Sequence, residues 1–201
     1  MSEQLPDYGW GHSPPHTASY LNAKVLKALA QHGARTVLDA GCGNGSLAGL
    51  LASKGYDVTG IDASASGIEV ARAQFPNLQL EIGTFETDPP GEFDAVCSTE
   101  VVEHLYSPHL LARYAFGALK PGGILIISTP YHGYLKNLAI ALSGKWDGHH
   151  TPLWHGGHIK FWSRKTLTLL LETEGFQIKE FQGAGRFPLL WKSMILVARR
   201  P

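Results

Sequence analysis

The sequence predicts an α/β fold in which a doubly wound, mostly parallel sheet of about seven strands lies between two layers of helices. Two observations predict this fold. Short apolar runs of strand length alternate with longer segments whose apolar residues recur at helical spacing, and parallel strands need such helical crossovers. A glycine-rich turn over 41–45 separates the first strand from the next helix, as in sheets that bind ligands at the ends of their strands.

Each expected element follows from its own pattern. Leu21, Val25 and Leu29 recur at helical spacing, so the first helix is expected over 17–33, where Gly33 ends it. Strand 36–39 leads into the glycine turn, and the apolar helix 47–53 is closed by Gly55. The expected order then continues with strand 57–61, helix 66–74, strands 78–82 and 93–98, helix 110–119, strand 124–128, helix 163–174, and strands 176–181 and 194–198.

Length and composition favour one globular domain. A chain of 201 residues with 17% charged residues can bury one substantial core, and it has no room for a second substrate domain. Lys+Arg and Asp+Glu balance at 17 each, so no positive field attracts nucleic acid, which makes a nucleic-acid partner a poor expectation. Cys42 and Cys97 have no zinc-like spacing. The chain has neither a signal-peptide pattern nor an apolar run that could span a membrane, so we expect a cytoplasmic monomer or homodimer.

The glycine turn carries the first chemical motif. Gly41, Gly43 and Gly45 allow a tight turn and let a ligand approach the backbone amides at a helix start. Asp39 precedes the turn, and Asp62 ends the second strand, where a carboxylate can accept both hydroxyls of a ribose. Dinucleotide sites usually lack the first acid, and their third glycine is replaced here by Ser46. An acid beside the turn suits a ligand with an ammonium and a sulfonium group.

This pattern resembles the class I S-adenosylmethionine-dependent methyltransferases over nearly the whole chain, including the stretch 119–123. The resemblance implies a Rossmann-like three-layer α/β/α domain over 1–201, with an antiparallel last strand and S-adenosylmethionine as cofactor. It also implies the cofactor contacts. These are Asp39, Gly41 and Gly43 at the methionine end, Asp62 at the ribose, Ala63, Thr84 and Phe85 at the adenine, and Glu100 facing the methyl group. Many members have an acid at the position of Thr84; here either Thr84 replaces that acid or Glu86 takes its role.

A second motif lies after the fourth strand. Glu100, Glu103 and His104 have i, i+3, i+4 spacing, which on a helical turn is one face. Two carboxylates and an imidazole suit Mg²⁺, Mn²⁺ or Zn²⁺, and such an ion activates a bound hydroxyl. The pattern resembles that of the O-methyltransferases of ubiquinone biosynthesis and of the terminal methyltransferases of small RNA. Their metal takes a further histidine downstream, where His158 stands here. A metal-free alternative, with His104 or His158 as general base or merely packed, stays open.

Two segments interrupt or precede the repeating pattern. The insertion 131–162 is too long for a connector and is expected to be the acceptor lid, with a group of aromatic and imidazole side chains: His132, Trp146, His149, His150, Trp154 and His155. The alternative is surface histidines beside an ordinary core helix over 138–142. The N-terminal arm 1–16 carries Tyr8, Trp10, His12 and His16, and it either closes over the cofactor or lies on the surface.

Three functions are compatible with these motifs. The leading hypothesis is methylation of a small-molecule hydroxyl, with Glu100, His104 and His158 as catalytic residues and a metal at Glu100, Glu103, His104 and His158. The second is 2′-O-methylation of an RNA 3′ end, which the lack of a basic surface disfavours. The third is a protein that binds S-adenosylmethionine without catalysis.

Overall fold

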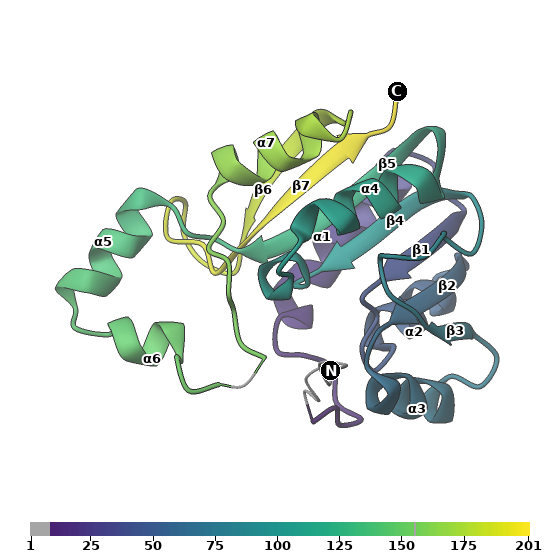
Figure 1. Cartoon of the computed structure of the whole chain (residues 1–201), viewed down its shortest axis with the longest axis horizontal. Coiled ribbons are helices and arrows are strands. Elements are labelled where there is room, and N and C mark those ends of the chain that lie inside the picture. Colours follow the sequence, from purple (N-terminus) through teal and green to yellow (C-terminus); the bar gives the residue numbers. More distant parts are fainter. Residues whose placement is uncertain (1–8, 155) are drawn as a thin grey trace.

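The computed structural model describes residues 9–154 and 156–201, and its centre is a seven-stranded sheet in the order β3-β2-β1-β4-β5-β7-β6 (Figure 1). All neighbouring strands are parallel except β7, which pairs antiparallel with both β5 and β6. The predicted α/β class and antiparallel last strand are therefore confirmed. The strands are β1 Thr36–Ala40, β2 Asp57–Asp62, β3 Gln79–Ile82, β4 Phe93–Thr99, β5 Leu119–Pro130, β6 Gln177–Ala184 and β7 Ser193–Arg199.

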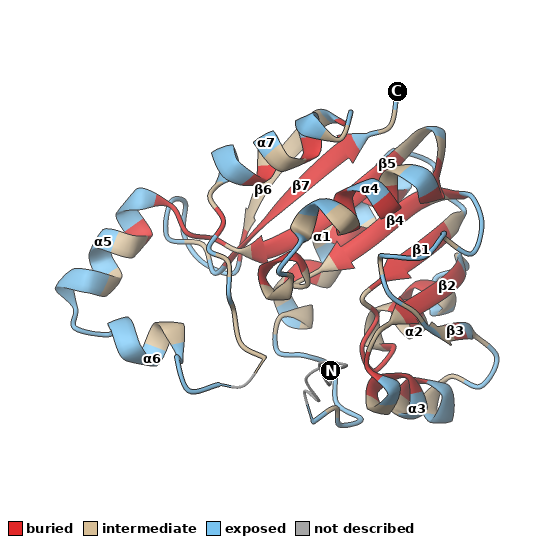
Figure 2. Cartoon of the chain, in the orientation of Figure 1, coloured by how far each residue is buried: buried red, intermediate tan, exposed pale blue. Residues whose placement is uncertain are grey.

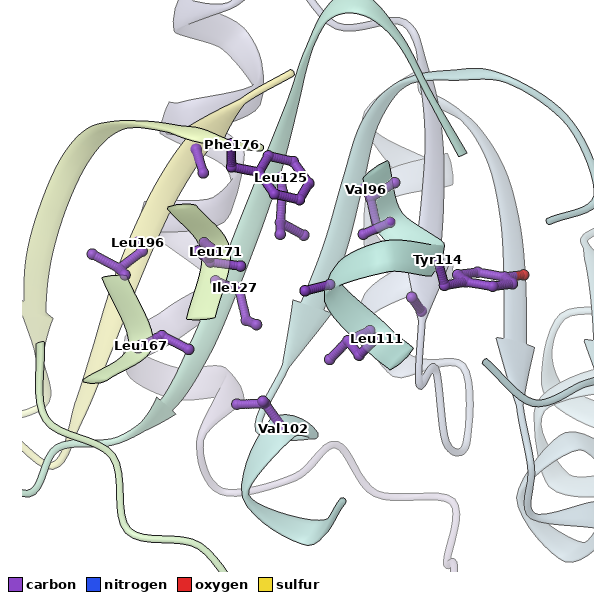
Figure 3. Packing of buried hydrophobic residues seen from close by; sticks show 14 of the residues in the cluster. Val96, Val102, Leu111, Tyr114, Leu125, Ile127, Leu167, Leu171, Phe176 and Leu196 are labelled. Carbon is purple, nitrogen blue, oxygen red and sulfur yellow. The ribbon is translucent and has the colours of Figure 1, made fainter. Parts of the chain in front are cut away.

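Helices cover both faces of this sheet. Buried side chains of α1, α2 and α3 form one apolar cluster with it, and those of α4 and α7 form the other. Figure 3 shows the second cluster, which includes Leu111 of α4, Leu167 of α7 and Ile127 of β5. The helices are α1 Ala18–Gln31, α2 Ser46–Ser53, α3 Ala65–Gln74, η1 Val102–His104, α4 Pro108–Ala118, α5 Tyr134–Leu142, α6 Trp146–His150 and α7 Arg164–Thr173.

The central strands are apolar on both sides, as the sandwich of layers requires. In β5, Ile124 and Ile126 face the cluster of α1 to α3, whereas Leu125 and Ile127 face that of α4 and α7. Figure 2 shows these strands almost continuously buried. β5 begins at Leu119, earlier than the expected residue 124, because Leu119 already pairs with Phe93 before a register shift.

The insertion holds two short helices, α5 and α6, which stand to one side of the sheet (Figure 1). The alternative of a core helix over 138–142 is wrong, because Leu138 is 40% exposed and Leu142 is 79% exposed. Most of both helices is exposed (Figure 2). Within the described residues, no helix is both long and apolar enough to cross a membrane.

Candidate functional site

One cavity of about 1380 Å³ opens at the carboxyl ends of the strands, where the strand order reverses between β1 and β4. Its lining comes from the N-terminal arm with the start of α1, the ends of β1 to β4, the segment from η1 to α4, the insertion, and the connection between β6 and β7. Single small-molecule pockets are typically about 300–1,000 Å³. The cavity therefore has room for two small ligands side by side.

The glycine turn forms one wall of this cavity. Gly41 has φ +88°, and a Cβ atom there would lie 2.4 Å from Val101 Cγ2, so only glycine fits. The Gly43 amide donates to Asp62 Oδ2 at 2.7 Å, and the Ser64 amide donates to Asp62 Oδ1 at 2.8 Å. These bonds hold the Asp62 carboxylate beside the turn, at the edge of the cavity.

Both predicted cofactor acids have raised pKa values. Burial, and then the charge of Asp62, raise the pKa of Asp39 to about 7, and the Asp39 side chain is 1% exposed. Its Oδ2 atom has no hydrogen-bond partner among the residues that the structure describes. Burial also raises the pKa of Asp62, although its two amide donors counteract the effect. A buried carboxylate of this kind gains from a cationic ligand group.

The remaining predicted cofactor residues differ in their access to the cavity. Ala63, Thr84 and Phe85 line it, whereas Gly43 does not. The Trp10 ring covers Gly43, since a Cβ atom on Gly43 would lie 2.3 Å from the Trp10 ring. Asn44 Nδ2 donates to the carbonyls of Gly11 and Ser13 at 2.7 and 2.9 Å. The described part of the arm, residues 9–16, is thus held against the turn, while Tyr8 lies outside the described residues.

Glu100 directly follows β4 and adopts a left-handed conformation, with φ +57°, which is uncommon for a residue other than glycine. Ser128 Oγ donates to its Oε1 at 2.8 Å, and Ser193 Oγ donates to its Oε2 at 3.0 Å. Burial raises the pKa of Glu100, and these two hydroxyls counteract the effect. The carboxylate is therefore fixed in one orientation at the cavity wall.

Glu103, His104 and His158 form a second polar group that lines the cavity. One ligand atom each of Glu103, His104 and His158 lies within 4.8 Å of the others. The carbonyl of Glu103 accepts the amides of Ile159 and Lys160, which ties the segment of His158 to η1. Both Glu103 carboxylate oxygens are buried, and neither has a hydrogen-bond partner of good geometry inside 9–154 and 156–201. Burial, and then the charge of Glu100, raise the pKa of Glu103, while the nearby Thr129 hydroxyl lowers it.

The rings of His104 and His158 pack edge-to-face, with their centroids 4.9 Å apart. Burial lowers the pKa of both, and that of His158 falls to about 4, so both rings are neutral at pH 7. His104 Nδ1 lies 2.8 Å from the Gly156 carbonyl, which selects the tautomer whose lone pair is on Nε2. Neutral imidazoles with an oriented lone pair serve either as metal ligands or as proton acceptors.

The family model for the methyltransferase domain matches residues 15–180. The chain belongs to this methyltransferase family. It is 33% identical over 168 residues to a probable S-adenosylmethionine-dependent methyltransferase of Mycolicibacterium smegmatis, covering 80% of this chain and 61% of that relative. It is 36% identical over 124 residues to a ubiquinone biosynthesis O-methyltransferase of Albidiferax ferrireducens, covering 58% of this chain and 49% of that relative. The predicted class I S-adenosylmethionine-dependent family is thereby confirmed.

A solved structure shows the same fold. The magnesium protoporphyrin IX methyltransferase of Synechocystis, with bound SAH, superposes with a TM-score of 0.70 at 22% identity and covers 90% of this chain and 82% of that one. At this identity the likeness shows the fold alone. The chain spans 61% and 49% of the length of the two curated relatives above.

The methyltransferase domain brings together three of the four predicted metal ligands. Glu100 lies outside the group of Glu103, His104 and His158. The expected helical face is wrong, because Glu100 adopts the left-handed conformation and only Val102–His104 form a 3₁₀ turn. The spacing i, i+3, i+4 therefore does not align the three side chains, and the two serines take up the Glu100 carboxylate instead.

Several residues of the domain's cavity were not predicted from the sequence. Tyr20, Lys136, Arg186 and Ser193 all line it, yet none belongs to a motif. The insertion contributes His132, His149 and His150 to the same wall, whereas His155 lies outside the described residues. One feature of the sequence could have drawn attention to Lys136: it is the only charged residue of the largely apolar helix α5.

Proposed function

We propose that this chain transfers the methyl group of S-adenosylmethionine to a hydroxyl oxygen of a small-molecule acceptor. One observation carries the proposal: a single cavity joins Asp39, Asp62 and the glycine turn to the buried group of Glu103, His104 and His158. Asp39, Asp62 and the turn suit a nucleoside that carries an amino-acid group. The group of Glu103, His104 and His158 suits a hydroxyl that must lose its proton. The ubiquinone O-methyltransferase relatives support oxygen as the atom that is methylated.

The residues at the turn fit the cofactor. The buried Oδ2 of Asp39 would pair with the ammonium of the methionine part, and Asp62 would accept from the ribose hydroxyls. Ala63, Thr84 and Phe85 would border the adenine. The bound cofactor supplies a methyl group already activated by its sulfonium, so the protein has to orient the acceptor and remove one proton.

The group of Glu103, His104 and His158 fits a divalent cation. Glu103 offers two buried carboxylate oxygens without hydrogen bonds in the described chain, and His104 and His158 offer neutral nitrogens. One oxygen and two nitrogen donors suit Zn²⁺ or Mn²⁺ better than Mg²⁺, which prefers oxygen. Such an ion would lower the pKa of the acceptor hydroxyl. Without it, His104 or His158 would accept the proton directly.

A titration with S-adenosylhomocysteine tests the cofactor end. Asp62→Ala should weaken its binding by about 2–4 kcal/mol, because charge-assisted hydrogen bonds to two hydroxyls are lost. Asp57→Ala is the matched control, since Asp57 is exposed at the opposite end of the same strand and should leave the affinity unchanged. Equal affinity in both variants would contradict the placement of the ribose.

Chelation tests the metal. Methyl transfer from radiolabelled S-adenosylmethionine should stop in EDTA and resume with Mn²⁺ or Zn²⁺. Calorimetric titration with Mn²⁺ gives a readout that is independent of activity, and Glu103→Gln and His158→Ala should each lose the binding heat. Activity that persists in EDTA, with no Mn²⁺ binding, would assign proton removal to the histidines alone.

A further inference from the structure

Lys136 is the one buried residue of α5, and its ammonium group lies at the cavity wall. Its Nζ donates to the carbonyl of Lys192 at 3.2 Å, and no carboxylate of the described chain makes an ion pair with it. Burial, and then the positive charge of Arg186, lower the pKa of Lys136 to about 8. A buried ammonium without a counter-charge is costly, so this position favours an anion from outside the chain.

Three imidazoles surround the same region. The ring of His132 lies 5.7 Å from that of His149 and 5.8 Å from that of His150, between centroids. Burial lowers the pKa of His132 and of His149 to about 4, and the charge of Lys136 contributes to both shifts. Both ring nitrogens of His150 are buried without a hydrogen bond among the described residues. At neutral pH these three imidazoles are uncharged, and each offers one N–H donor beside the charged Lys136.

The acids of the cavity do not balance this charge. Glu100 is the acid that acts on Lys136, but Ser128 and Ser193 already bind its two carboxylate oxygens. Glu103 belongs to the group with His104 and His158. Lys136 and Arg186 thus carry positive charge at the cavity, and the neutral His132, His149 and His150 add N–H donors; we call these five lining residues the basic cluster.

We propose that the basic cluster binds an oxyanion, a carboxylate or a phosphate, carried by the methyl acceptor. This step rests on the proposed function for the identity of the ligand as the acceptor. The position of the cluster supports it. Lys136 binds the carbonyl of Lys192, and the next residue, Ser193, binds Glu100, so the oxyanion would lie beside the carboxylate that is expected to face the methyl group. The anion would anchor the acceptor while its hydroxyl points to the group of Glu103, His104 and His158.

Calorimetry with small probes tests the proposal. The protein, free and saturated with S-adenosylhomocysteine, is titrated in low-salt buffer with 3,4-dihydroxybenzoate, with its uncharged counterpart catechol, and with inorganic phosphate. We expect at least one of the two anions to bind, and 3,4-dihydroxybenzoate to bind about tenfold or more tightly than catechol. Binding of phosphate alone would assign the oxyanion to a phosphate group.

Three variants identify the responsible groups. Lys136→Met and Arg186→Gln should each weaken anion binding by about tenfold, and Arg186 is exposed, so its variant is informative even where Lys136→Met folds poorly. Lys145→Met is the matched control, because Lys145 is an exposed lysine of the same insertion that does not line the cavity, and binding should not change. Absence of binding of both anions in the millimolar range, or equal binding in Arg186→Gln and the wild type, would overturn the proposal.

The two proposals fail separately. Charge-dependent binding that needs Arg186, without methyl transfer to any hydroxyl compound, would contradict the proposed function and retain the oxyanion site. Methyl transfer to uncharged and anionic acceptors at equal kcat/KM, unchanged in Arg186→Gln, would contradict the oxyanion site and retain the proposed function.

Discussion

Ser193 donates a hydrogen bond of 3.0 Å to Glu100, which joins the start of β7 to the end of β4 across 93 residues of sequence. Tyr20 Oη lies 3.3 Å from the same Ser193 hydroxyl, so α1 also contacts this pair. Ser128 holds the other Glu100 oxygen at 2.8 Å. Residues of β7, β5 and α1 thus hold one carboxylate that lines the cavity.

Removal of this hydrogen bond should reduce catalysis more than cofactor binding. Ser193→Ala leaves Glu100 with one hydroxyl donor, which is worth about 1–2 kcal/mol and corresponds to a fall in kcat of roughly 5- to 30-fold. Steady-state kinetics and S-adenosylhomocysteine titration check both parts. Ser53→Ala, on the exposed end of α2, is the control and should behave as wild type. A larger loss of affinity than of kcat in Ser193→Ala would place Glu100 with the cofactor only.

The raised pKa of Asp39 predicts proton release when S-adenosylhomocysteine binds. With a pKa of about 7 the buried carboxyl is largely protonated at pH 6, and a ligand ammonium beside it favours the ionised form. Binding should therefore release protons below about pH 7 and release fewer as the pH rises through the pKa of the free protein. Calorimetry at pH 6 in buffers of different ionisation enthalpy measures this number.

Asp39→Asn should bind the ligand more weakly and should lose this part of the proton release. Asp57→Asn serves as the control, because its carboxylate is exposed. Unchanged proton release in Asp39→Asn would show that another group, such as Asp62, is the source.

The arm should detach when its attachment is removed. Asn44 donates to two arm carbonyls, and Asn44→Ala deletes both hydrogen bonds, each worth about 0.5–1.5 kcal/mol. We expect faster proteolysis within residues 9–16, and weaker S-adenosylhomocysteine binding because Trp10 and His16 line the cavity. Mass spectrometry of a limited digest identifies the cleavage sites. Asn77→Ala, in an exposed turn, should digest like the wild type.

Acid should weaken the contact between the starts of β1 and β4. Asp94 accepts from the amides of Arg35 and Thr36 at 2.9 Å each and from Lys120 Nζ at 2.8 Å, which holds its pKa well below the usual range. Because the folded-state pKa is depressed, this stabilisation is present above the unfolded carboxyl pKa of about 3.9 and is lost as the pH falls below it.

Asp94→Asn should therefore lower the free energy of unfolding by about 1–2 kcal/mol at pH 7, mainly through the amide bonds, since Lys120 is 43% exposed. The difference from wild type should shrink in urea titrations below about pH 4. Asp88→Asn, in an exposed loop, should show no such difference at either pH.

The sequence predicts the sheet well because its pattern is local. Alternating apolar runs locate each strand, and the glycine turn with Asp39 and Asp62 locates one end of the cavity. The conformation of Glu100, in contrast, depends on residues that are distant in the sequence. Its φ of +57° is unusual for glutamate, and its partners Ser128 and Ser193 come from strands far along the chain. No spacing rule could therefore foresee that Glu100 leaves the group of Glu103 and His104.

The insertion is a second region whose structure could not be predicted from the sequence. Its apolar stretch 138–142 left a core helix open as an alternative to a lid, yet α5 exposes its leucines and buries Lys136. The orientation is set by the carbonyl of Lys192 and by the neighbouring cavity, and both depend on the β6–β7 connection. Only the three-dimensional structure brings these segments together.

Metal-assisted methyl transfer by this chain can be tested with one crystal structure. The protein is crystallised with S-adenosylhomocysteine and Mn²⁺, and anomalous data are collected for manganese. We predict the ribose at Asp62, the amino group at Asp39, and a single anomalous peak between Glu103, His104 and His158. S-adenosylhomocysteine bound elsewhere, or a cavity with the ligand at Asp62 but no anomalous peak at these three residues, would contradict the metal-assisted transfer proposed for this chain.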